Sequence, residues 1–133
     1  MREILFRGKP INERSTIEWI EGGIKTKDGR AFIIGMSSKM RVEAMEVHPN
    51  TVGQYTGMNI YGQKIFEGDI LRLDYIGPGR GVQGVAEVVF KYGKFCMPWG
   101  HRKELVPLDG FANTTMEIIG NIHDNPELLG GGE

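Results

Sequence analysis

The sequence has little that could cross-link the chain or anchor it in a membrane. Its only cysteine, Cys96, cannot form a disulfide within the chain, so the fold must rest on buried apolar side chains. No apolar run approaches the roughly 20 residues that span a bilayer. The first ten residues carry Arg2, Arg7 and Lys9 and lack the apolar segment of a secretory signal. We therefore expect a cytoplasmic protein without membrane association.

An excess of either charge is also missing. The chain has 16 Lys and Arg against 17 Asp and Glu, a net charge of −1 that favours neither a polyanionic nor a polycationic partner. The distribution is uneven, because residues 91–103 contain four Lys or Arg and no acid, whereas residues 117–133 contain four acids and no Lys or Arg. This asymmetry could steer a partner, or it could reflect two ordinary solvated faces.

Patterns that bind metals or phosphates are absent as well. The three histidines lie far apart in the sequence, and Cys96 has no partner cysteine for a metal site. The glycine-rich residues 77–81 lack the Lys-Ser/Thr ending of a phosphate-binding P-loop, so we interpret them as a hairpin loop that displays Arg80. We predict no metal and no cofactor.

Glycine, by contrast, is abundant, and its 20 copies are spaced like turns between short strands. Asp28 and Gly29 predict a tight hairpin turn between strands at residues 24–26 and 31–34. Residues 37–47 are ambiguous, because their apolar residues fit a strand only in part and also fit a helix; we favour a strand that enters a turn at residues 48–50. Thr51 is expected to cap one helical turn over residues 52–55.

The second half carries the stronger strand signal. Residues 69–75 alternate as a half-buried strand does, with Leu71 and Leu73 on the face opposite Arg72. Near the end, Asn125 followed by Pro126 is typical of a helix start. Several short antiparallel strands with one terminal helical turn predict a small SH3-like barrel.

The predicted fold class is therefore mainly β, a β-rich α+β arrangement of short antiparallel strands. We expect a smaller β-rich N-terminal subdomain over residues 1–56 and the SH3-like barrel subdomain over residues 57–129. Residues 130–133, which are mostly glycine, are expected to form a disordered tail.

Two carboxylates, Glu67 and Asp69, flank Gly68 directly before an apolar strand. With Asp74 they could serve a hydrolase or nuclease, but acid–base catalysis needs carboxylates that converge on a substrate, which residues two apart around a glycine rarely do. Gly68 can supply the unusual φ of a tight turn, and Asp69 can bond the backbone of that turn. We predict a turn that starts a strand, and no enzyme. Cys96 is likewise interpreted as a small buried side chain rather than a nucleophile.

One segment, residues 91–103, is the candidate binding surface. Its aromatic side chains could stack on bases while its basic side chains meet phosphates, as in small barrels that bind single strands. The alternative is that Phe95 and Trp99 belong to the core and the lysines solubilise an edge strand. The candidate macromolecule-binding residues are Arg80, Lys91, Tyr92, Lys94, Phe95, Trp99, Arg102 and Lys103.

Four blocks occur in order along the chain: "VGQYTG", "KIFEGDIL", "VVFKYGKF" and "EIIGNIHDNPELL". Together with the opening "MREILFRGK" they resemble the YopX family of phage and prophage proteins. The sequence departs from that family between Gly57 and Phe66, where the usual charged turn is replaced by the shorter, more apolar "MNIYGQK". Ile60 or Tyr61 could therefore contact a neighbour or a partner.

The resemblance implies a β-rich phage protein and brings no established activity or catalytic residue with it. We expect a non-enzymatic phage or prophage accessory protein that acts in the cytoplasm of the bacterial host. Its partner would be a host or phage macromolecule, with a protein favoured over nucleic acid. The alternative is single-stranded nucleic-acid binding through residues 91–103. Self-association is a further possibility, since edge strands pair readily.

Overall fold

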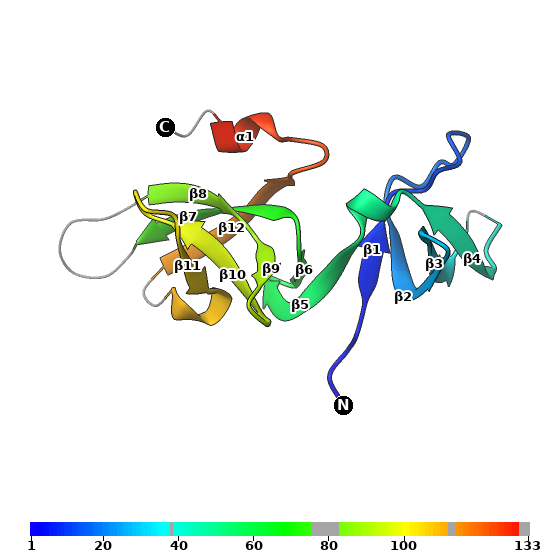
Figure 1. The fold of residues 1–133 in the computed structure, drawn as a ribbon, viewed down its shortest axis with the longest axis horizontal. Helices are drawn as coiled ribbons and strands as arrows, with labels where there is room; N and C mark the ends of the chain where they lie inside the picture. Colours follow the sequence, from blue (N-terminus) through cyan, green and yellow to red (C-terminus); the bar gives the residue numbers. More distant parts are fainter. Residues whose placement is uncertain (38, 76–82, 112–113, 131–133) are drawn as a thin grey trace. The chain divides into compact units, whose positions relative to one another are not determined.

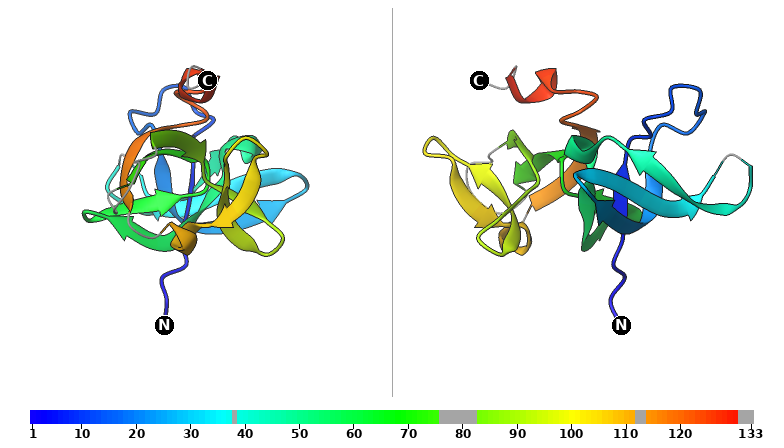
Figure 2. Two further views of the ribbon diagram at one scale, coloured as in Figure 1. Left: turned by 90° about the vertical axis from the view of Figure 1, so that its left-hand side faces the viewer. Right: turned by 45° about the vertical axis from the view of Figure 1, so that its right-hand side comes forward.

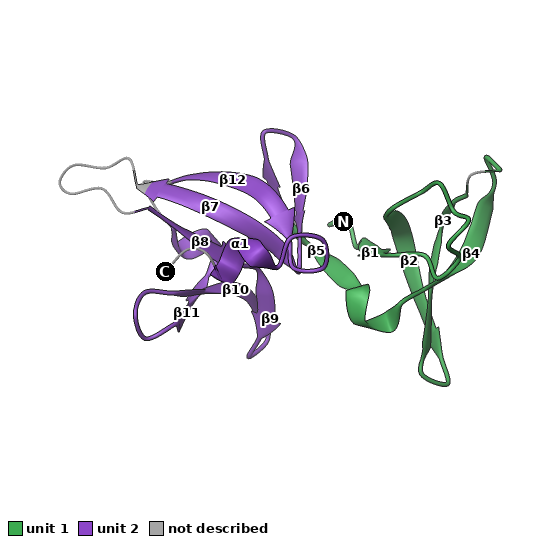
Figure 3. Ribbon diagram, turned by 90° about the horizontal axis from the view of Figure 1, so that it is seen from above, with its two compact units in different colours: residues 1–57 green, residues 58–133 purple. Residues whose placement is uncertain are grey.

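The computed structural model describes residues 1–37, 39–75, 83–111 and 114–130. It is mainly β, as predicted, and it divides into two compact units, Met1–Gly57 and Met58–Glu133 (Figure 3). No helix in the described part of the chain is long and apolar enough to cross a membrane. The predicted tail is outside the described residues apart from Gly130.

Unit 1 is built from antiparallel hairpins (Figure 1). Its elements are β1 (Phe6–Gly8), β2 (Ile20–Lys27), β3 (Arg30–Met36), β4 (Val42–Val47), the 3-10 turn η1 (Pro49–Thr51) and β5 (Gly53–Ile60), which continues into unit 2. The strand order of the sheet is β4-β3-β2-β1-β5-β6, in which β6 (Gln63–Phe66) belongs to unit 2. The predicted turn at Asp28 and Gly29 joins β2 to β3, with φ angles of 52° and 77°.

The helical turn predicted for residues 52–55 is wrong, because these residues belong to or lead into β5, which pairs with β1. The helical turn instead comes earlier, over Pro49–Thr51. Thr51 ends it rather than starting one: its hydroxyl donates to the His48 carbonyl at 2.6 Å and accepts from the Lys9 N–H at 2.9 Å. A contact with a residue 42 positions away thus fixes the role of Thr51.

Unit 2 contains curled antiparallel sheets (Figure 2, left). Its elements are β6 (Gln63–Phe66), β7 (Asp69–Tyr75), β8 (Gln83–Glu87), β9 (Val89–Lys91), β10 (Lys94–Trp99), β11 (Glu104–Pro107), η2 (Leu108–Gly110), β12 (Thr114–Asn121) and α1 (Glu127–Gly130). Strands β12, β7 and β8 form one sheet, and β11, β10 and β9 form another. The finer assignment to an SH3-like barrel stays a prediction.

Each unit has its own hydrophobic core. In unit 1 the buried residues are Ile20, Ala31, Ile33 and Val47. In unit 2 they are Ile65, Leu71, Leu73, Ala86, Val88, Met97 and Leu108. Cys96 is fully buried, which confirms its interpretation as a small core side chain.

The predicted turn around Gly68 is confirmed. Gly68 has a φ of 93°, and the Asp69 side chain, 2% exposed, accepts a hydrogen bond from the Phe66 N–H at 2.8 Å. The same turn joins neighbouring segments, because the Gly68 N–H donates to the Val88 carbonyl and the Gly68 carbonyl accepts from the Ile122 N–H. The Asp69 carboxylate therefore serves the structure of the turn.

Candidate functional site

The predicted basic and aromatic segment is divided by the fold. Residues 91–103 run from the end of β9 through β10 to the start of β11. Lys91 lies opposite Lys94 at one end of β10, whereas Trp99 lies opposite Glu104 at the other. A six-residue strand spans about 17 Å between its end residues, at roughly 3.3 Å per residue. The predicted residues therefore occupy two ends of a sheet rather than one patch.

The β9–β10 turn carries one group of them. Tyr92 and Gly93 form the turn, with φ angles of 53° and 77°, and the Tyr92 side chain is exposed beside Lys91 and Lys94. Phe95 instead packs against the core of unit 2, with its ring edge-on to Phe90 at 4.9 Å between centroids. We name Lys91, Tyr92 and Lys94 the basic tip.

The other end of β10 carries Trp99, whose ring is packed rather than free to stack. It lies edge-on to Phe111 at 5.5 Å and covers Gly84, where an added Cβ would come within 2.4 Å of a ring carbon. Arg102 and Lys103 are exposed in the following turn. Arg80 lies outside the described residues.

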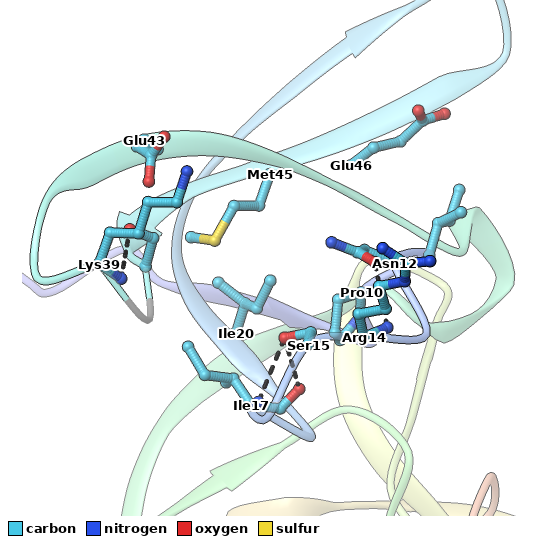
Figure 4. Close-up of a pocket in the computed structure, with 12 residues that line it drawn as sticks. Pro10, Asn12, Arg14, Ser15, Ile17, Ile20, Lys39, Glu43, Met45 and Glu46 are labelled. Atoms are coloured by element: carbon cyan, nitrogen blue, oxygen red, sulfur yellow. Dashed lines mark hydrogen bonds between the residues drawn. The ribbon is translucent and has the colours of Figure 1, made fainter.

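A feature that the sequence reasoning missed is a cleft of about 410 Å³ in unit 1, between β4 and the chain that leads into β2 (Figure 4). Ile17, Ile20 and Met45 give it an apolar floor, and Met45 points toward Ile20. The loop beside it is held by Asn12, whose side chain accepts from the Arg14 N–H at 3.0 Å and whose carbonyl accepts from the Ser15 N–H. The wall of the cleft opposite β4 is therefore a turn whose conformation these two hydrogen bonds fix.

Charges around the cleft are uneven. Glu46 makes two hydrogen bonds with Arg30, at 2.7 and 2.9 Å, which lower the pKa of Glu46 and raise that of Arg30. That acid is therefore already matched by a base. Arg14 and Lys39 also line the cleft, against Glu43. None of these three side chains forms an ion pair within the described residues. The two cations therefore exceed the one carboxylate by a single positive charge.

Strand β4 is an edge of the sheet, and the chain covers only its C-terminal end. The Ile11 N–H donates to the Glu46 carbonyl at 3.0 Å, and the His48 N–H donates to the Lys9 carbonyl at 2.9 Å. Pro10 lies opposite Val47 between these bonds. Beyond Ile11 the chain turns away at the Asn12 loop, so no strand of the described residues lies beside the rest of β4 on this side.

The backbone groups at this open edge follow from the register. The Ser37 N–H donates to the Arg41 carbonyl, so Arg41, Glu43 and Met45 direct their backbone groups toward β3. By alternation Val42, Ala44 and Glu46 direct theirs away from β3, as the Glu46 bond to Ile11 shows. Among these, the groups of Val42 and Ala44 lie along the uncovered length of the edge.

Exposed apolar side chains cluster on the hairpin that β3 and β4 form. Figure 2, right, shows the backbone of this hairpin. We name Ile34, Met36, Met40 and Val42 the hairpin patch; their side chains are 42, 54, 82 and 69% exposed. Met36 lies directly opposite Val42. A signal for the patch was present, because "AFIIGM" places apolar residues on both faces of β3, and a sheet with two apolar faces needs a cover on each.

No group of three or more His, Cys, Asp or Glu side chains gathers at metal-binding distance within the described residues. Of the three carboxylates considered above, Asp69 is buried in its turn, and Asp74 lies near Arg72, at 3.6 Å between Oδ1 and Nε. Asp69 is therefore engaged in its own turn, and Asp74 lies beside the Arg72 side chain.

A family model described as "YopX protein" matches residues 5–130. The chain belongs to the YopX family. The structure is similar to the crystal structure of protein yopX from Bacillus subtilis, with a TM-score of 0.63, 15% identity, and coverage of 97% of this chain and 99% of that one. It is also similar to a crystal structure of a protein from Enterococcus faecalis, with a TM-score of 0.50, 23% identity and the same coverage.

No curated protein matches this YopX family chain. The predicted resemblance to the family is confirmed by the match over most of the chain. At identities of 15 and 23%, the two crystal structures show a shared fold alone. Function must therefore be argued from the surfaces of this chain.

Proposed function

We propose that this YopX family chain is a non-enzymatic binding module that docks a protein on the β3–β4 hairpin of unit 1. The observation that supports it best is the hairpin patch, whose four exposed apolar side chains lie beside the uncovered edge of β4. Contiguous exposed apolar surface marks interaction sites in soluble proteins, and an open edge is a template for pairing. The chain would act as a phage or prophage accessory protein in the cytoplasm of the bacterial host.

A protein partner is favoured over nucleic acid by the chemistry of this surface. Apolar side chains such as Met36 and Val42 gain from contact with another apolar surface, whereas phosphates require clustered basic groups. Two of the three aromatic side chains predicted to stack on bases, Phe95 and Trp99, are packed in unit 2. Asp69, one of the three carboxylates considered for catalysis, accepts a hydrogen bond within its own turn.

The experiment is affinity capture from host lysate with the wild type and with the double variant Met36→Ser/Val42→Ser. Both side chains are exposed, so the fold should be retained. The matched control is Phe90→Ser, which removes an exposed apolar side chain from unit 2. We expect a protein that the wild type and the control capture and the double variant does not, with the difference reproduced by calorimetry on the purified pair. Identical captures by all three chains would refute the proposal.

A second candidate is single-stranded nucleic-acid binding at the basic tip, favoured by the exposure of Tyr92 between Lys91 and Lys94. Binding of this kind should weaken as salt rises, because phosphate contacts release counterions, and Tyr92→Ser should remove a stacking platform. A fluorescence titration with labelled single-stranded DNA and RNA at two salt concentrations tests it. Binding that is absent, or that does not change with salt, would exclude this candidate.

A further inference from the structure

We propose that the uncovered edge of β4 binds an extended segment of the partner protein as an additional antiparallel strand, and that the adjoining cleft selects a segment with an acidic side chain. This inference rests on the proposed protein-binding function and specifies its geometry. Its starting point is that the chain itself begins to cover this edge at Lys9 to Ile11 and then leaves it.

The backbone supplies the direction and the position of the added strand. Residues 9–11 run antiparallel to the end of β4, with Pro10 opposite Val47. A guest strand that continues this ladder would next meet Ala44 and then Val42, whose N–H and carbonyl groups point away from β3. Main-chain hydrogen bonds of this kind give affinity in β-strand addition, while pockets for alternate side chains give specificity.

Side chains of a guest strand would alternate between two surfaces. Residues opposite Glu43 and Met45 would point to the cleft side, where Ile17 and Ile20 complete an apolar floor. Residues opposite Val42 and Ala44 would lie on the other face, next to the hairpin patch. A guest segment therefore needs apolar side chains on both of its faces. An edge with an apolar surface on one side only would need them on one face.

Charge selects among such segments. Arg14 and Lys39 stand on opposite sides of the cleft, and Glu43 lies near Lys39 on β4 (Figure 4). Since Glu46 is already matched by Arg30, the remaining balance at the cleft is positive. An Asp or Glu of the guest on the cleft side, away from the position directly opposite Glu43, would be attracted, and a Lys or Arg at the same place would be repelled.

A second copy of this chain fits the edge less well. The register that uses the outward groups of both Val42 and Ala44 would pair Val42 with Ala44 of the second copy and would place two Glu43 side chains directly opposite each other. Like charges in directly opposed positions destabilise a strand pair. The cleft charge and this repulsion both favour a different protein as the occupant.

The test is a selection of random dodecapeptides by ribosome display on the full chain, followed by calorimetry on the selected peptides. The edge variant is Ala44→Pro, which removes an N–H that points away from β3 and leaves the ladder with β3 in place. Arg14→Glu and Lys39→Glu test the charge, and Lys25→Glu, at an exposed position of β2, is the matched control. Circular dichroism of each variant checks the fold.

We expect proline-free peptides with apolar residues at neighbouring positions, so that both faces of the strand carry them, and with at least one Asp or Glu. Ala44→Pro should weaken binding at least tenfold, and each cleft reversal should weaken it more than Lys25→Glu does. N-methylation along the peptide gives a readout that needs no variant protein: it should abolish binding at every second residue and leave the residues between them unaffected.

The proposal is overturned if no peptide is selected, if the selected peptides are basic, or if N-methylation shows no alternation. It is also overturned if ultracentrifugation finds a wild-type dimer that Ala44→Pro dissolves, because the edge would then hold a second copy. Loss of the captured protein with Met36→Ser/Val42→Ser but not with Ala44→Pro would leave the proposed function standing and refute the added strand. If neither variant changes capture, both proposals fail.

Discussion

The two acids that flank Gly68 have different surroundings. Substituting each of them therefore distinguishes a structural role of these carboxylates from a catalytic one. Asp69 is 2% exposed and accepts the Phe66 N–H at 2.8 Å, whereas Glu67 is only half-buried. Phe66 is buried as well, so loss of its acceptor would leave an N–H without access to water. We predict that Asp69→Ala destabilises the fold more than Glu67→Ala, the matched control, does.

The magnitude follows from the hydrogen bond. A bond to a charged acceptor contributes about 1.5–3 kcal/mol, and a buried donor left unsatisfied costs about 1–3 kcal/mol. These describe the same loss, so Asp69→Ala should lower the free energy of unfolding by about 2–3 kcal/mol. Asp69→Asn keeps an oxygen acceptor without the charge and should cost about 1 kcal/mol. Glu67→Ala should cost less than Asp69→Ala, because Glu67 is only half-buried.

Urea unfolding followed by circular dichroism measures these differences, provided that the m-value is unchanged between variants. Equal effects of Asp69→Ala and Glu67→Ala would refute the structural role of Asp69. The hydrogen bond to Phe66 would then contribute no more to the free energy of unfolding than the Glu67 side chain does. An Asp69→Ala chain as stable as the wild type would refute it too, and would mean that the buried carboxylate is retained for some other purpose.

Three further predictions concern unit 2. Gly84→Ala would place a Cβ 2.4 Å from the Trp99 ring, so it should cost about 1–3 kcal/mol and change Trp99 fluorescence, measured in a Trp19→Phe background. Gly68→Ala puts a side chain at a φ of 93° and should cost about 1 kcal/mol in urea unfolding. The pKa of Glu87 is raised, chiefly by burial, so its contribution to stability is present below its ordinary pKa and lost as pH rises through the raised value. Glu87→Gln should therefore be more stable than the wild type at pH 7 and equal to it in acid, as urea unfolding at the two pH values will show.

Local chemistry explains what the sequence could predict. Asp28 and Gly29 adopt positive φ angles that few other residues tolerate, so these two residues were enough to predict the hairpin. The same holds for Gly68, and Asp69 beside it has a short side chain suited to bonding a turn. Where a turn depends on the residues within it, sequence reasoning succeeded.

Distant contacts explain what it could not. Thr51 was expected to start a helical turn, but a bond from Lys9 and the pairing of β5 with β1 decide its surroundings. In the candidate site, residues 91–103 are neighbours in the chain, yet β10 carries Lys94 and Trp99 to opposite ends of a sheet. Whether Trp99 is exposed depends on Gly84 and Phe111, which no pattern within the segment reveals.

The β4 edge raises a general difficulty, since an exposed edge beside apolar side chains invites aggregation. Charged residues near an edge are one way in which proteins prevent indiscriminate pairing, and this edge has Lys39 and Arg41 before β4 and Glu43 within it. The same charges that hinder pairing between copies also discriminate between guest segments, because Glu43 repels its own counterpart while Lys39 attracts an acid. Neutralising them should therefore have two effects at once, more self-association and less preference for acidic peptides. A change in only one of these properties would mean that solubility and selectivity at this edge have separate causes.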